Sequence, residues 1–113
     1  MDNLFFTIKK AKELNYEIHL RYVGVANPEI AKERVRQRIA RGGHGVSEGT
    51  LERRFETSKE NFIKIYPLCD SVIIYDNTKQ MMCVASIRAG ALTLIQHIDW
   101  VDELLGELGL IKA

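Results

Sequence analysis

Arginines gather on both sides of a glycine-rich loop in the first half of the chain. Residues 32–54 hold seven basic residues against three acidic ones, and arginine outnumbers lysine six to one. The basic residues are Lys32, Arg34, Arg36, Arg38, Arg41, Arg53 and Arg54. Because arginine binds phosphate through two N–H groups at once, this pattern is typical of a lid that closes over phosphates. A solvated helix face would carry similar charge, and that alternative stays open.

Three further polar residues near this segment are candidates for ligand binding. His44 lies within the loop Gly42-Gly43-His44-Gly45, where it either contacts a ligand or anchors the loop. Asn61 follows Arg54 by seven residues, so the two share one face of a helix. An ion pair or a cap on a neighbouring element would explain Arg54 nearly as well. Asn77 lies in the turn Asp76-Asn77-Thr78.

Other catalytic and metal-binding patterns are missing from the sequence. No cluster of His, Cys and acidic residues has metal-ligand spacing, so we expect no metal site. Cys69 and Cys83 do not form a CxxC pair, and we expect both to be buried, reduced thiols. The glycines of the loop are not followed by Lys-Ser or Lys-Thr, as a phosphate-binding GxxxxGK[ST] loop requires.

Hydrophobic periodicity and capping residues predict elements of an α/β fold that position these residues. Asn27 before Pro28 marks one helix start, and Ser47 marks another. A short apolar run at 72–75 is typical of a buried parallel strand. The predicted elements are a helix at 3–14, a strand at 16–25, helices at 28–41 and 47–66, a strand at 72–75, an antiparallel hairpin of 81–87 with 91–95, and a last helix capped by Asp99.

Length and composition are those of one ordinary globular domain spanning residues 1–113. The net charge is +1, with 46% hydrophobic and 27% charged residues. No apolar run approaches the ~20 residues of a membrane-spanning helix, and the first residues do not resemble a secretory signal. We therefore expect a cytoplasmic protein with no membrane partner. The near-zero net charge argues against general nucleic-acid binding.

Several segments together resemble the zeta toxin-like family of P-loop kinases. They are Ala11–Leu20, Arg34–Arg38, Arg41–Val46, Arg53–Phe55 and Tyr75–Thr78. The similarity covers about residues 4–78 and corresponds to the later half of such a kinase. It implies a partial P-loop kinase-like fold of three layers, with a short parallel sheet and a C-terminal antiparallel hairpin. It also implies ATP and Mg²⁺ as cofactors and a hydroxyl of a small molecule as the phosphate acceptor; zeta toxins proper phosphorylate UDP-N-acetylglucosamine.

The resemblance also implies roles for particular residues. Residues about 32–54 correspond to the lid region, where Arg41, Arg53 or Arg54 would stabilise the transferring phosphate. We assign His44 and Asn61 as candidate cofactor-binding residues, together with Asn77, whose turn would lie near the nucleotide base.

The chain departs from the family because it lacks the phosphate-binding loop and the acidic general base of the first half. We expect it to be the C-terminal part of an ATP-dependent small-molecule kinase, inactive alone, with a phosphorylated nucleotide or sugar nucleotide as ligand. Its partner would be the missing N-terminal half or a second copy. The alternatives are a non-catalytic self-associating module, because a half-sheet exposes its edges, or a nucleic-acid-binding protein acting through the basic helix at 32–41.

Overall fold

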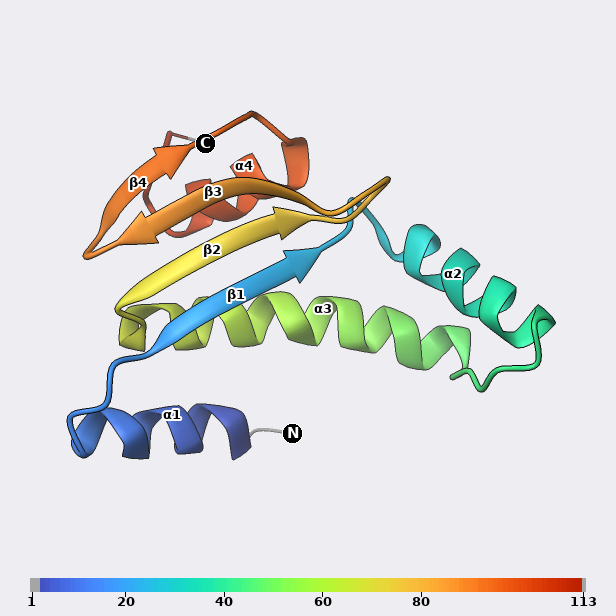
Figure 1. The fold of residues 1–113 in the computed structure, drawn as a ribbon, viewed down its shortest axis with the longest axis horizontal. Coiled ribbons are helices and arrows are strands. Elements are labelled where there is room, and N and C mark those ends of the chain that lie inside the picture. The colour runs from blue at the N-terminus through green and yellow to red at the C-terminus, as the bar shows by residue number, and fades with distance from the viewer. Residues whose placement is uncertain (1–2, 113) are drawn as a thin grey trace.

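The computed structural model describes residues 3–112 as a mixed α/β fold built on one four-stranded sheet (Figure 1). In chain order its elements are α1 (Asn3–Glu13), β1 (His19–Gly24), α2 (Pro28–Ala40), α3 (Glu48–Ile65), the 3-10 turn η1 (Tyr66–Leu68), β2 (Ser71–Asp76), β3 (Met82–Arg88), β4 (Ala91–Leu94) and α4 (Asp99–Glu107). None of the helices in this range is long and apolar enough to cross a membrane.

The sheet has the order β1-β2-β3-β4 and mixes both pairing directions. β1 and β2 are parallel, with Gly24 opposite Asp76 at their carboxyl ends. β2, β3 and β4 form an antiparallel meander, which confirms the predicted hairpin. The parallel part is therefore one strand pair, joined through the two long helices α2 and α3, as a parallel connection requires.

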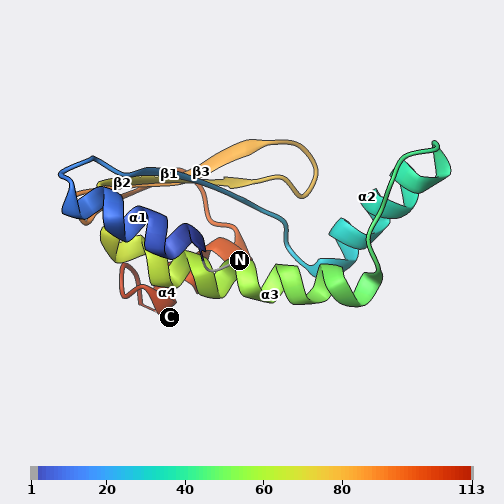
Figure 2. The same ribbon diagram turned by 90° about the horizontal axis from the view of Figure 1, so that it is seen from below.

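Helices α1, α3 and α4 lie on one face of the sheet (Figure 2). The core forms between that face and these helices, where Val72 and Ile74 of β2 pack with Phe62 of α3 and Leu104 and Leu105 of α4. No helix among residues 3–112 covers the opposite face. The three layers that we expected are thus reduced to two in this range, because α1, α3 and α4 lie on the same side of the sheet and α2 extends beyond it.

Helix α2 and the beginning of α3 extend beyond the sheet as a helical arm (Figures 1 and 2). The predicted caps are confirmed, since Asn27 accepts from the Ile30 N–H and Ser47 from the Thr50 N–H. Lys32 is 6% exposed, and its ammonium group donates to the carboxylates of Glu29 in its own helix and Glu52 in α3. This ion pair links the two helices. The predicted lid-like segment is therefore a pair of ordered helices joined by the glycine-rich loop.

Two predicted boundaries were wrong. The strand begins at His19 and not at Tyr16, because the Tyr16 N–H bonds back to the Ala11 carbonyl and Asn15 has a φ of 67°, which turns the chain out of α1. Asp99 does not cap α4, since Ile98 occupies the cap position without a side-chain bond. Asp99 lies instead in the first turn, where a carboxylate favours the positive end of the helix dipole.

Candidate functional site

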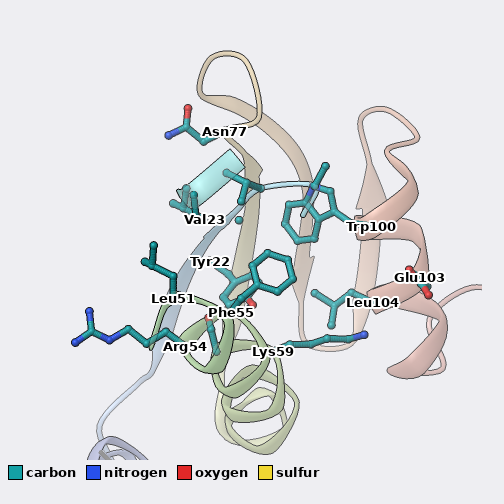
Figure 3. A pocket seen from close by; sticks show the side chains of 15 residues that line it. Tyr22, Val23, Leu51, Arg54, Phe55, Lys59, Asn77, Trp100, Glu103 and Leu104 are labelled. Carbon is teal, nitrogen blue, oxygen red and sulfur yellow. Dashed lines mark hydrogen bonds between the residues drawn. The ribbon is translucent and has the colours of Figure 1, made fainter. Parts of the chain in front are cut away.

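A pocket of about 340 Å³ opens at the carboxyl end of β1, between α3 and α4 (Figure 3). Its lining residues are Tyr22–Ala26, Ala31, Leu51, Arg54, Phe55, Ser58, Lys59, Asn77, Trp100, Glu103 and Leu104. They come from β1, both helices of the arm, the turn after β2, and α4. Open α/β sheets characteristically bind ligands beyond the carboxyl ends of their parallel strands. Position and lining make this pocket the candidate functional site.

Aromatic side chains form the inner wall of the pocket. Tyr22, Phe55 and Trp100 lie around its interior in Figure 3. The Tyr22 and Trp100 rings are 6.4 Å apart between centroids. The Tyr22 hydroxyl and the Ser58 hydroxyl form a 3.2 Å hydrogen bond, and burial raises the pKa of Tyr22. The interior of the pocket is therefore suited to a flat, partly apolar group.

Charged and amide side chains surround this aromatic interior. Arg54 and Lys59 of α3, Glu103 of α4 and Asn77 after β2 all line the pocket (Figure 3). The Lys59 ammonium pairs with Glu107 at 3.3 Å, whereas Arg54 forms no side-chain hydrogen bond or ion pair with any residue in the 3–112 range. The exposed Arg54 guanidinium is therefore the cation of the pocket most available to an anionic ligand.

Hydrogen bonds fix the turn at residues 76–78 beside the pocket. Asp76 is 4% exposed and its Oδ1 accepts from the Thr78 hydroxyl at 2.6 Å and from the Trp100 Nε1–H at 2.8 Å. The Ala26 N–H donates to the Thr78 hydroxyl at 3.0 Å, and Arg34 of α2 donates to the Thr78 carbonyl at 2.8 Å. This network joins the ends of β1 and β2 to α2 and α4.

Two hollows adjoin the pocket. One is lined by Asp76, Thr78 and Lys79 and shares Ala26, Trp100 and Glu103 with the pocket, so the Trp100 side chain borders both cavities. The other lies along α3 and shares Tyr22, Arg54 and Ser58. Arg53 and Asn61 line this second hollow.

The structure brings some of the candidate residues together and leaves others apart. Arg54 and Asn77 line the pocket, and Arg53 and Asn61 lie in the adjoining hollow with Arg54. Arg54 and Asn61 thus share a face of α3, as their spacing predicts. Arg41 and His44 are exposed at the far end of the arm and line none of these three cavities.

Part of the basic segment is neutralised within the arm. Hydrogen bonds to Glu52 and Glu29 raise the pKa of Lys32. Arg36 binds Glu33 and Glu48, which raise its pKa, and Arg34 is engaged by the Thr78 carbonyl. These three basic residues therefore hold the arm in place. Arg38, Arg41, Arg53 and Arg54 are exposed and form no ion pair within residues 3–112.

Sequence reasoning missed the roles of Asp76, Trp100 and Gly24 in shaping the pocket. The sequence predicted Asp76 only as part of a turn, and Trp100 was not among the candidate residues. A Cβ atom on Gly24 would lie 2.5 Å from Cη2 of Trp100, so the indole packs directly on the backbone at the end of β1. The available signals were an acidic residue, Asp76, at the end of one strand and a glycine, Gly24, at the end of another. Their common partner, Trp100, lies 24 residues beyond Asp76 in the sequence.

Comparisons with known proteins place the chain beside one uncharacterised relative. The chain matches no known protein family and no solved structure. It is 35% identical over 48 residues to an uncharacterised protein of Haemophilus influenzae. The match covers 42% of this chain and 34% of the relative, so the chain spans about a third of the relative's length.

Proposed function

We propose that the chain binds a phosphorylated small molecule, a nucleotide or sugar nucleotide, as the lid-bearing C-terminal part of a zeta toxin-like kinase. The observation that carries the proposal is the pocket at the carboxyl end of β1, which has Arg54 and Asn77 on its wall and the arginine-bearing arm beside it. Arg54 is available for a bidentate contact to phosphate oxygens. The order of the family-like segments along the chain supports the same proposal.

The residues present do not fit a complete Mg²⁺–ATP site. In the part of the chain that the structure describes, no three His, Cys, Asp or Glu residues group to hold a metal ion. The sequence also has no GxxxxGK[ST] loop to cradle the phosphates. The proposed activity of this chain is therefore ligand binding and positioning, and we derive no phosphoryl-transfer step for it alone.

Substitution of Arg54 tests the proposal. In isothermal titration calorimetry with UDP-N-acetylglucosamine and with ATP, we expect binding to the wild-type chain to weaken roughly tenfold in Arg54→Ala, because one charge-assisted contact is lost. Arg38→Ala is the matched control: it removes the same charge from an exposed residue of α2 that lines none of the three cavities. The proposal would be contradicted if the wild-type chain bound neither ligand, or if the two variants lost affinity equally.

A second candidate function is self-association without catalysis. The observation that favours it is the sheet face opposite the helices, which no other element within residues 3–112 covers, together with the free edge of β1. An unpaired strand edge is a template for pairing with a second copy. If this function holds, light scattering shows a dimer or larger species whose fraction rises with protein concentration. A monomer at all concentrations contradicts it.

A further inference from the structure

We propose that Trp100 is a specificity-determining residue that stacks against a planar ring of the bound ligand, and that Asp76 is the residue that positions it. The inference rests on the proposed function, because it concerns the same pocket. It adds the chemistry of the part of the ligand that enters the pocket: a flat heteroaromatic ring such as a nucleobase, attached to a phosphate that remains at the rim.

The Trp100 indole is held on two sides. Its Nε1–H donates to Oδ1 of Asp76 at 2.8 Å, and that carboxylate is itself buried and bonded to the Thr78 hydroxyl. The benzene ring of the indole lies on Gly24, where even a methyl group would not fit. A side chain fixed in this way loses little further freedom on binding a ligand, so its stacking energy is available for affinity.

Charged side chains line both ends of the pocket, with Glu103 of α4 on the side of Trp100 and Arg54 of α3 on the other side (Figure 3). Trp100, Tyr22 and Phe55 surround the interior, and the Tyr22 hydroxyl is occupied by Ser58. Arg54 is exposed and lies on the side away from Trp100 (Figure 3). An amphipathic ligand with a flat ring at one end and an anionic group at the other matches this arrangement. Aromatic rings stack on the faces of all bases, so the wall accommodates more than one base.

The experiment uses the fluorescence of Trp100, which is the single tryptophan of the chain and so reports on its own environment. The probes are UDP and ADP, which carry ring and phosphate, uridine, which carries the ring alone, and inorganic pyrophosphate, which carries phosphate alone. We expect UDP or ADP to quench the emission with saturation, uridine to quench it at higher concentrations, and pyrophosphate to bind without quenching. Pyrophosphate binding is measured by calorimetry.

Substitutions separate a stacking role from a structural one. In calorimetry, Trp100→Leu is expected to weaken binding of the nucleoside diphosphate by about 5- to 100-fold, the range for loss of one stacked base, and to leave pyrophosphate binding unchanged. Tyr75→Leu is the matched control, since Tyr75 lies outside the pocket lining. Asp76→Ala is expected to shift the tryptophan emission of the free protein and to weaken binding of only those probes that contain a ring. Asp76→Asn keeps an oxygen acceptor for the indole N–H, so we expect it to retain the wild-type emission and the wild-type affinity.

The outcomes distinguish the inference from the proposed function. Nucleoside diphosphates that bind without quenching, or that bind Trp100→Leu as tightly as the wild type, overturn the stacking role and leave the proposed function in place. Uridine that binds as tightly as UDP overturns the proposed function and keeps the ring site. Absence of binding by every probe overturns both. The fluorescence titration uses the unaltered chain, so it decides the question even if Trp100→Leu fails to fold.

Discussion

At the scale of single residues, the pocket depends on a contact between a glycine and a tryptophan. Gly24 ends β1, and Trp100 is the second residue of α4. The missing side chain of Gly24 makes room for the ring of Trp100. Asp76, at the matching position on β2, receives the indole N–H. The buried carboxylate thus has donors for its Oδ1, as buried polar groups require.

We expect Gly24→Ala to destabilise the protein by about 1–3 kcal/mol, because the new methyl group would overlap the indole and one of the two must move. Chemical denaturation measures the loss, and a shift in tryptophan emission should accompany it. The matched control is Gly49→Ala near the start of α3, where a Cβ would meet only Arg53 at an ordinary 3.8 Å. It should be neutral or slightly stabilising. Equal effects at both positions would refute the packing argument.

At the scale of elements, two junctions set the position of the pocket. Lys32 joins α2 to α3, and the Arg34–Thr78 bond joins α2 to the end of β2, so the arm is fixed at its base beside the pocket. At the opposite end of the sheet, Asp70 lies just before β2 and links that strand to β1 and α1. Its carboxylate accepts from the Ile18 N–H, just before β1, at 2.7 Å and from Lys12 of α1 at 3.3 Å.

The Asp70 junction predicts a dependence of stability on pH. The Ile18 N–H, assisted by Lys12, lowers the pKa of Asp70 below its ordinary value of 3.8. The ionised carboxylate therefore contributes stability that is present above pH 3.8 and is lost as the pH falls through the lower pKa of the folded state. Asp70→Asn should lower stability at neutral pH and flatten the acid limb of a plot of unfolding free energy against pH.

Urea unfolding at a series of pH values measures this effect. The control is Glu60→Gln on α3, an exposed carboxylate that forms no ion pair with any residue described. This variant should follow the wild-type curve. An acid limb that is as steep in Asp70→Asn as in the wild type would show that other carboxylates cause the acid destabilisation.

At the scale of the whole molecule, local signals in the sequence predicted the elements, and long-range contacts decided their assembly. The caps Asn27 and Ser47 and the apolar run at 72–75 are local signals, and they correctly predicted α2, α3 and β2. The reduction to two layers could not be predicted in this way, because it depends on which side of the sheet each helix takes. Only part of the pocket could be predicted. The arginine pattern indicated Arg54 and the turn indicated Asn77, whereas tertiary packing alone brings Trp100 into the same lining.

The most direct test of the central claim, that the pocket at the end of β1 binds a phosphorylated small molecule, is a map of amide chemical shifts during titration with UDP-N-acetylglucosamine. We expect saturable changes concentrated at Tyr22–Ala26, Arg54–Lys59, Asn77 and Trp100, which in Arg54→Ala saturate only at roughly tenfold higher ligand concentration. Changes confined to the far end of the arm around Arg41 and His44, or no saturable changes at all, would contradict it.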